Sequence, residues 1–303
     1  MEKRRDYAPI VIFGFNRLEP LKACVEALLA NSEAKDTDLF VFVDGPREGN
    51  PDEAKKVAKV RDYAASITGF LSLHTYFSDV NKKLGPSIIA GVSKVLDQYE
   101  RAIVMEDDLV CGKNYLSFMN QCLDYYENKE NVFSVCGYSN AVKTPANYPY
   151  DAYFCPRSAS TGWATWRDRW QSVDWQLDDW TAVKRNARAF NHWGGSDCYS
   201  MLRGWKEGIN QSWAIRFCYS QFVQNRLSVF PTTSHILNIG FNGEGTNCKK
   251  WSRFKYEFDT SERKDFAFPP EVQTIPSIKK SFLAYHGYLA RAYSRLMYMV
   301  HRS

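Results

Sequence analysis

The sequence predicts an α/β protein built on a mostly parallel β-sheet flanked by helices. Two patterns in the first half indicate this class. Short apolar runs of strand length alternate with longer segments in which apolar residues recur at helical spacing. Polar or charged residues follow directly after three of the apolar runs, as expected where buried parallel strands end at a ligand site. With 303 residues, 45% of them apolar, the chain can bury a substantial core.

The first predicted strand covers residues 10–15 and is followed by Arg17. A helix comes next, because apolar residues recur at helical spacing after Pro20, which suits the first turn of a helix. Residues 39–43 form a second apolar run that ends at Asp44. The sequence Asp-Gly-Pro at this point is also consistent with a simple turn.

The next three segments continue the alternation of helix and strand. Residues 52–65 are charged, with apolar side chains on one helical face only. A third strand is expected at residues 70–77 and another helix at residues 85–99. Asn81 and Lys82 lie between these two elements.

The fourth apolar run, residues 102–105, leads without interruption into Glu106, Asp107 and Asp108, and a helix is expected at residues 115–126. Three adjacent negative charges repel one another, so a compact fold tolerates them best when a cation or a bound group offsets the field. Our hypothesis is a divalent-metal site at the end of this strand. A solvated acidic turn remains the alternative from these residues alone.

Several classes of protein have no support in the sequence. It contains neither a Gly-x-Gly-x-x-Gly nor a Gly-x-x-x-x-Gly-Lys-Ser/Thr motif, so dinucleotide-binding and P-loop chemistry are not indicated. The net charge of +5 is spread along the chain and does not indicate nucleic-acid binding. The eight cysteines form no Cys-x-x-Cys pair, which argues against zinc ribbons and disulfide scaffolds. No segment is long enough to span a bilayer, so we expect a cytosolic protein.

From about residue 150 the chain becomes aromatic and irregular. In residues 158–170, Trp163, Trp166 and Trp170 fall on one face of a predicted helix. Such a stripe most often packs on a sheet, although one exposed ring edge could stack on a sugar.

The remaining predicted elements are a helix at residues 213–225, a strand at residues 227–231 and a glycine-rich polar loop at residues 238–247. The loop is suited to close over a ligand. Residues 280–303 are predicted to form a basic amphipathic helix, either docked on the domain or lying on an anionic membrane.

These residues together resemble a glycosyltransferase of the GT-A type, in particular the inverting N-acetylglucosaminyltransferase I-like family and similar bacterial polysaccharide transferases. The resemblance covers roughly residues 8–250 and is most specific at Glu106-Asp107-Asp108-Leu109, which is similar to the metal-binding "DXD" motif. It implies the following division of the chain: a single catalytic domain at residues 8–262, with a nucleotide-sugar half at residues 8–142 and an acceptor half at residues 143–262, followed by a tail at residues 263–303.

The resemblance also implies a role for each polar strand end. Arg17 would contact the diphosphate or ribose of the donor. Asp44 would accept a hydrogen bond from the uracil N–H, which favours a UDP-sugar. Asn81 and Lys82, or the neighbouring Lys83, would lie beside the nucleotide.

At the acidic strand end the implied roles are divided between the three carboxylates. Glu106 and Asp107 would lie beside the ribose and the sugar, and Asp108 would be the ligand of Mn²⁺ or Mg²⁺. A hard cation bridging two phosphoryl oxygens would offset the charge that develops on the leaving diphosphate. Trp163 and Trp213 would belong to the acceptor side.

The general base that inverting transfer requires has no obvious candidate. The family places an aspartate at the start of the helix before the strand at residues 227–231, whereas this chain has residues 210–213 there, without a carboxylate. Glu207 and Asp197 are the nearest acidic candidates. Each also has an equally good structural explanation: Glu207 as a surface charge and Asp197 as a helix cap. Asn247 stands where the family usually has a histidine, so it stays open whether that loop makes a second contact with the metal or with phosphate.

We therefore expect a metal-dependent inverting transferase that moves a sugar from a UDP-sugar to a saccharide acceptor. A lipid-linked acceptor at the inner face of the cytoplasmic membrane, in surface polysaccharide synthesis, is the setting we favour. Two alternatives stay open at this point: a sugar nucleotidyltransferase and a non-catalytic carbohydrate-binding module.

Overall fold

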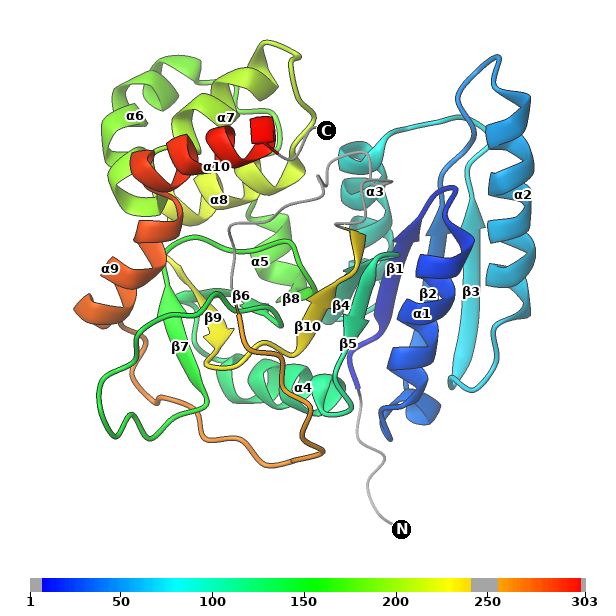
Figure 1. The fold of residues 1–303 in the computed structure, drawn as a ribbon, viewed down its shortest axis with the longest axis horizontal. Coiled ribbons are helices and arrows are strands. Elements are labelled where there is room, and N and C mark those ends of the chain that lie inside the picture. The colour runs from blue at the N-terminus through cyan, green and yellow to red at the C-terminus, as the bar shows by residue number, and fades with distance from the viewer. Residues whose placement is uncertain (1–6, 241–255, 301–303) are drawn as a thin grey trace.

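The computed structural model describes residues 7–240 and 256–300. An eight-stranded sheet with the order β3-β2-β1-β4-β8-β6-β9-β7 forms its centre (Figure 1). Six of the strands run in one direction, and β8 and β7 run in the other. This arrangement confirms the predicted α/β class with a mostly parallel sheet. The strands are β1 (Ile10–Gly14), β2 (Asp38–Val43), β3 (Ser72–Phe77), β4 (Arg101–Glu106), β6 (Val132–Cys136), β7 (Ala152–Cys155), β8 (Trp163–Trp166) and β9 (Leu227–Pro231).

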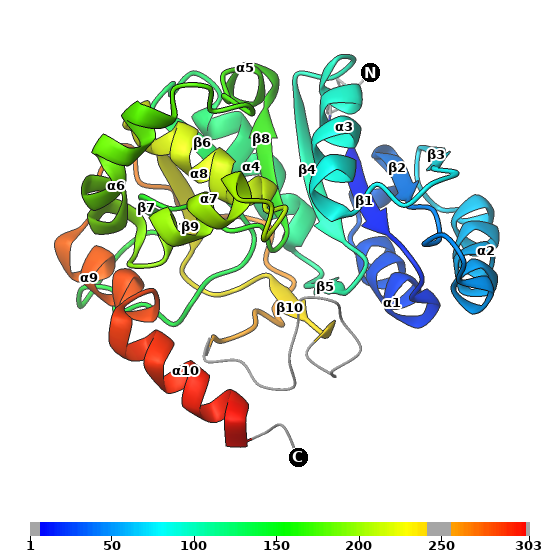
Figure 2. The same cartoon turned by 90° about the horizontal axis from the view of Figure 1, so that it is seen from above.

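Helices cover both faces of the sheet, as Figures 1 and 2 show. On one face, apolar side chains of α1 (Leu18–Leu29), α2 (Pro51–Ser66) and α4 (Tyr115–Tyr126) pack into the main core cluster. On the other face, α3 (Leu84–Leu96), α5 (Arg167–Gln171) and α8 (Trp213–Val223) form a second cluster.

The other described elements lie around this three-layer body. A short antiparallel pair, β5 (Leu109–Cys111) and β10 (Ile236–Asn238), continues from the end of β4. A satellite cluster joins α6 (Trp180–Gly194) and α7 (Cys198–Lys206) to α8, and a 3₁₀ turn covers Ala34–Asp36. The last helices are α9 (Pro276–Tyr285) and α10 (Tyr288–Val300). Within the described ranges, no helix is both long and apolar enough to cross a bilayer.

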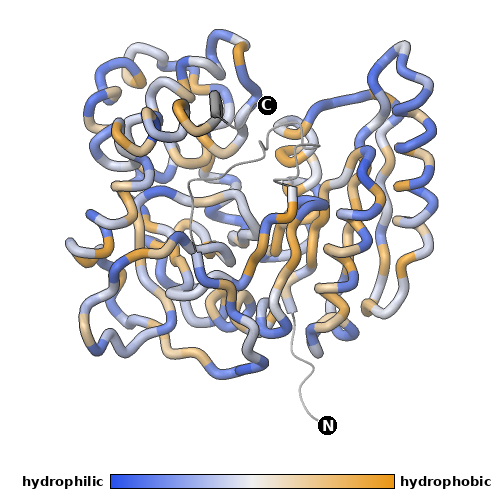
Figure 3. The backbone as a smooth tube through the Cα atoms, viewed as in Figure 1, coloured by the Kyte–Doolittle hydropathy of each residue, from blue (hydrophilic) through white to orange (hydrophobic). Residues whose placement is uncertain are grey.

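Strand β4 lies in the middle of the sheet, and its apolar residues are buried. Each of residues 102–105 is at most 1% exposed. Their apolar side chains alternate between the two core clusters, because successive residues of a strand point to opposite faces. Figure 3 shows the apolar residues concentrated in these central strands.

The predicted elements of the first half are confirmed, with ends that differ by a few residues. The helix expected at residues 115–126 has these bounds in the structure, and the helix expected at residues 52–65 is α2. The buried face of α2 carries Val57, Val60 and Ala64.

The helix predicted for residues 158–170 is wrong. The structure forms strand β8 there, followed by the short helix α5. A spacing of three residues puts Trp163 and Trp166 on opposite faces of a strand, and they accordingly pack in different core clusters. The rings are buried, as expected for a stripe that packs on a sheet, since Trp163, Trp166 and Trp170 are each 2% exposed, but Trp163 and Trp166 belong to a strand of the sheet itself.

The single helix predicted for residues 280–303 is also wrong, because the chain forms two helices, α9 and α10, that are separated at His286 and Gly287. The segment before them shares the main core: Phe268 is 9% exposed and packs with Phe118 and Tyr126 of α4. The predicted glycine-rich loop from residue 241 onwards, including Asn247, lies outside the described residues.

Helix α3 can approach β1 closely only because residue 91 is a glycine. A Cβ atom at Gly91 would lie 2.7 Å from the ring of Phe13 and 3.3 Å from the ring of Phe42. We expect Gly91→Ala to lower the free energy of unfolding by about 1–2 kcal/mol. Packing strain of up to about 3 kcal/mol exceeds the gain of roughly 1 kcal/mol from replacing a helical glycine with alanine. Urea denaturation measures the difference.

Gly287→Ala is the matched control. The nearest atoms to its added Cβ would be 3.5 and 3.7 Å away, which is ordinary van der Waals contact. Equal losses of stability in the two variants would contradict the close packing of α3 on β1.

Candidate functional site

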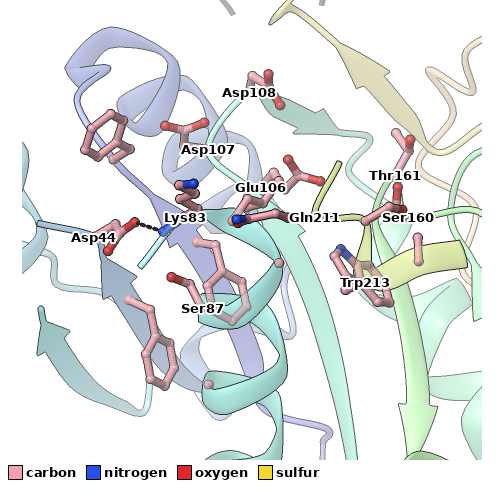
Figure 4. A pocket seen from close by; sticks show the side chains of 18 of the residues that line it. Asp44, Lys83, Ser87, Glu106, Asp107, Asp108, Ser160, Thr161, Gln211 and Trp213 are labelled. Carbon is pink, nitrogen blue, oxygen red and sulfur yellow. Dashed lines mark hydrogen bonds between the residues drawn. The ribbon is translucent and has the colours of Figure 1, made fainter. Parts of the chain in front are cut away.

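A cavity of about 1550 Å³ lies between the two halves of the chain. One side is formed by the residues that follow β1, β2 and β4, and the opposite side by residues 158–161 and by residues 210–213 at the start of α8 (Figure 4). The carboxyl ends of parallel strands meet at one edge of a sheet. This geometry is why Arg17, Asp44 and the acidic strand end, which are far apart in sequence, line the same cavity.

Arg17 binds the acidic strand end directly. Its Nη2 atom donates to Oδ2 of Asp108 at 3.0 Å and also to Oδ1 of Asp107. The arginine side chain is 22% exposed, whereas the two carboxylates are 8% and 5% exposed. Burial alone would lower the pKa of Arg17, but the two carboxylates raise it above its ordinary value. The guanidinium therefore stays charged and offsets part of the negative charge.

One guanidinium does not neutralise three carboxylates. Burial, followed by the charges of Asp108 and Asp107, raises the pKa of Glu106 to about 8. Burial also raises the pKa of Asp107 to about 6, although Arg17 opposes this shift. Negative charge is therefore costly at this buried strand end, and a bound cation would lower that cost.

The donor set fits a cation that is held only in part by protein. In the ranges that the structure covers, no group of three His, Cys, Asp or Glu residues could hold a metal ion by itself. Asp107 and Asp108 supply carboxylate oxygens, the ligands that Mg²⁺ and Mn²⁺ prefer. Oδ2 of Asp108 is bonded to Arg17, and its Oδ1 accepts no hydrogen bond from any described residue. These two residues would suffice only if a substrate supplied the other ligands.

Gly240 lies against Asp108 from the second half of the chain. The backbone N–H of Ile239 donates to the carbonyl oxygen of Asp108 at 3.0 Å. A Cβ atom at Gly240 would lie 2.2 Å from Oδ2 of Asp108, so only glycine permits this approach. The β5–β10 pair thereby brings residues 238–240 to the rim of the acidic site, a contact that the sequence did not predict.

Asp44 holds the segment after β3 in place. Its Oδ1 accepts hydrogen bonds from the backbone N–H groups of Gly45 and Lys82, and its Oδ2 accepts one from the N–H of Lys83 at 2.9 Å (Figure 4). Lys83 has a φ of 66°, a conformation that is uncommon for a residue with a side chain. Asn81 adds a hydrogen bond to the Gly45 carbonyl oxygen at 2.8 Å. Asp44 therefore holds the backbone of Lys82 and Lys83 in place, which is a structural role beyond its predicted contact with uracil.

Trp213 lines the cavity, and Trp163 does not. The two rings stack with their centroids 4.7 Å apart. Trp163 is 2% exposed, so its contribution in this structure is to support Trp213 from behind. Ser212 begins helix α8 by accepting a hydrogen bond from the N–H of Ile215.

Neither predicted base candidate lines the cavity. Asp197 is held by Arg157 through two hydrogen bonds of 2.8 and 3.2 Å. Burial raises the pKa of Asp197, but the charge and hydrogen bonds of Arg157 oppose this effect, and the net shift of the pKa is downward. A carboxylate with a lowered pKa is a weak base. Glu207 caps the C-terminal end of α7, where its half-exposed side chain lies 3.7 Å from Arg203.

The structure adds cavity residues that sequence reasoning missed. They share a polar character and an origin in irregular segments, where no periodic pattern could indicate them: Asn140, Arg157, Ser158, Ser160, Thr161, Gln211 and His286. Gly85 joins the two sides, because a Cβ atom there would lie 2.1 Å from the carbonyl oxygen of Gln211. The side opposite the acidic strand end, which we call the neutral polar side, therefore carries these polar groups together with apolar side chains.

Comparison with known proteins gives only remote likeness. No protein-family model matches the chain, and neither does any curated protein. Solved structures that match include Staphylococcus aureus TarS (10% identity, 77% of this chain, TM-score 0.40) and the mannosyltransferase PcManGT from Pyrobaculum calidifontis in complex with GDP-Man and Mn²⁺ (10% identity, 74% of this chain and 78% of that chain, TM-score 0.32). A UDP-glucose pyrophosphorylase complexed with UDP-glucose also matches (10% identity, 74% of this chain and 90% of that chain, TM-score 0.34).

The match spans 37% of the TarS chain and 59% of a shorter TarS structure. At these identities and TM-scores the likeness does not identify a family for this chain.

The two base candidates should respond differently to amide substitution. Asp197→Asn leaves the guanidinium of Arg157, which is 13% exposed, without its partner. We expect the free energy of unfolding to fall by about 3–5 kcal/mol, as for a broken buried ion pair. Glu207→Gln is the matched control and should change it by less than about 0.5 kcal/mol. Urea denaturation at pH 7 measures both.

The pH dependence supplies a second readout. Because the pKa of Asp197 lies below its ordinary value of 3.8 in the folded protein, its stabilising contribution is complete above that value and disappears as the pH falls through the folded pKa. The difference between wild type and Asp197→Asn should therefore narrow below about pH 3.8. A similar decrease in the free energy of unfolding in Asp197→Asn and Glu207→Gln at pH 7 would contradict a stabilising ion pair between Asp197 and Arg157.

Proposed function

We propose that the protein is a metal-dependent glycosyltransferase that moves a sugar from a UDP-sugar to a saccharide acceptor with inversion. One observation carries this proposal: a single cavity has a charged side, built from three parallel strand ends, that faces the neutral polar side, which carries no carboxylate among the described residues. The charged side suits a nucleoside diphosphate with its cation. The neutral polar side suits a sugar hydroxyl.

The residues that would bind the donor are already held in position. Arg17 is fixed by Asp107 and Asp108 and offers a charged N–H fork beside the cavity. Asp44 fixes the backbone of Lys82 and Lys83, so that both cationic residues border the same space. Arginine and lysine are common ligands of diphosphates. We favour uracil as the base because Oδ2 of Asp44 accepts one hydrogen bond from the described residues and can accept another from the uracil N–H.

The metal would be held by Asp108, with Asp107 beside it. A bound Mn²⁺ or Mg²⁺ would supply charge neutralisation for the leaving diphosphate. The protein's own contribution is to hold these carboxylates beside the guanidinium of Arg17 and to orient them from a rigid strand. The Glu106 carboxylate points toward the side of the cavity that carries Gln211 and Ser160 (Figure 4), where we place the transferred sugar.

On the acceptor side, Ser160, Thr161 and Gln211 are available to bind hydroxyl groups, and the small exposed part of Trp213, which is 5% exposed, would border the sugar ring. The cavity-lining carboxylates among the described residues all belong to the charged side, and they are Asp44, Glu48, Glu106, Asp107 and Asp108. We therefore look for the general base among these groups and no longer favour Asp197 or Glu207. We place the protein in the cytoplasm, with a lipid-linked saccharide as the acceptor.

Calorimetry with UDP tests this proposal. We expect UDP binding to the wild-type protein in the presence of Mn²⁺ and at least about tenfold weaker binding in its absence. Asp108→Asn should abolish the effect of Mn²⁺ and lower the rate of donor hydrolysis by at least about a hundredfold. The substitution removes a metal ligand and opens no core cavity.

Asp52→Asn is the control, since it removes an equally charged side chain that is 85% exposed on α2. Equal UDP affinity with and without Mn²⁺ would contradict the proposal. Incorporation of UTP and a sugar phosphate into a UDP-sugar would instead support the nucleotidyltransferase alternative, whereas saccharide binding without nucleotide or metal would support the carbohydrate-binding module.

A further inference from the structure

Helix α10 exposes four large apolar side chains to solvent. Tyr288, Leu289, Tyr293 and Leu296 are 73%, 88%, 54% and 54% exposed. They are four of the thirteen large apolar side chains that are exposed in the described part of the chain. Their spacing puts them on one face of a helix, which we call the α10 apolar face.

The opposite face of α10 is the one that contacts the protein. Ser294 is 3% exposed, and Ala290 and Arg291 are only partly exposed. Nη1 of Arg291 donates to the carbonyl oxygen of Ser196 at 3.1 Å. A helix that covers a protein core normally buries its apolar side. In α10 the polar side is buried and the apolar side is exposed.

Helix α9 shows the usual orientation, which makes the contrast with α10 clear. Its Ile278 and Phe282 are 0% and 2% exposed and pack in a core cluster with Tyr153 and Phe230. The junction between the two helices is fixed as well, because the carbonyl oxygen of His286 accepts hydrogen bonds from the backbone N–H and the hydroxyl group of Ser196. The exposure of the α10 apolar face therefore follows from a defined attachment of α10 to the protein.

The charge of this segment indicates what covers the face. Residues 272–303 contain five Lys or Arg residues and no Asp or Glu. A helix with an apolar face of leucine and aromatic side chains in a purely basic segment fits the interface of an anionic bilayer. Tyrosine is enriched at that interface because its ring is apolar and its hydroxyl group is polar.

We propose that the α10 apolar face is the surface by which this protein docks on an anionic lipid bilayer. Docking would bring the cavity to the membrane, because His286, which begins the turn into α10, also lines the cavity. On the proposed transferase function, this geometry delivers a lipid-linked acceptor to the neutral polar side of the cavity. The docking itself does not depend on that function.

Vesicle flotation of the full chain tests the proposal. We expect binding to vesicles that contain phosphatidylglycerol, weaker binding to phosphatidylcholine vesicles, and a decrease with added salt. The triple variant Leu289→Ser/Tyr293→Ser/Leu296→Ser should reduce binding by at least about tenfold. Its fold should be intact because the three side chains are exposed, and circular dichroism checks this. Donor hydrolysis by the variant should equal that of the wild type, so that failure of docking and failure of the transferase proposal are distinguishable.

The control is Leu71→Ser/Val223→Ser, which removes two apolar side chains that are 42% and 53% exposed and lie far from α10 in the sequence. It should bind vesicles as the wild type does. Full binding by the triple variant would overturn the proposal. A wild-type dimer in light scattering that becomes a monomer in the triple variant would also overturn it, because a second copy of the chain would then cover the face.

Discussion

The ion pairs between Arg17 and the aspartates at the end of β4 are the interaction on which the rest of the site depends. A central strand with a buried apolar interior delivers three carboxyl groups to one point, and burial raises the pKa values of Glu106 and Asp107. Arg17, supplied by the neighbouring parallel strand, offsets part of this charge. On the proposed function, a bound cation would lower the cost of the remaining negative charge and would allow phosphate groups to bind beside the carboxylates.

The second side of the cavity is built onto the same sheet. Strand β8 pairs antiparallel with β4 and carries Trp163, which supports Trp213 at the cavity wall. Gly85 lets α3 touch residue 211, and Gly240 lets the β10 segment touch Asp108. These close approaches allow little shift between the two sides, so the separation between a bound donor and an acceptor would be set by the packed body of the protein.

Much of the fold was predictable from the sequence, because parallel strands buried on both faces leave unbroken apolar runs and the helices between them keep a helical period. The polar strand ends were predictable for the same reason. The tryptophans at residues 163, 166 and 170 misled the prediction, because their spacing fits one face of a helix. A strand buried on both faces can have the same spacing. The neutral polar side of the cavity and the ion pair between Arg157 and Asp197 could not be predicted. Their residues come mainly from irregular segments, where contacts between residues far apart in the sequence determine the structure. The exposed face of α10 was visible as an amphipathic pattern, but which side would face the protein was not.

The most direct test of the central claim is the release of nucleoside diphosphate from a panel of UDP-, GDP- and dTDP-sugars by the purified protein, with Mn²⁺, with Mg²⁺ and with chelator. Slow donor hydrolysis needs no acceptor. It therefore tests whether the acidic strand end and Arg17 act on a nucleotide sugar even though the acceptor is unknown. We expect release of UDP from at least one UDP-sugar, and only when a divalent cation is present. Folded protein that releases no nucleoside diphosphate from any donor, or that does so equally well in chelator, would contradict it.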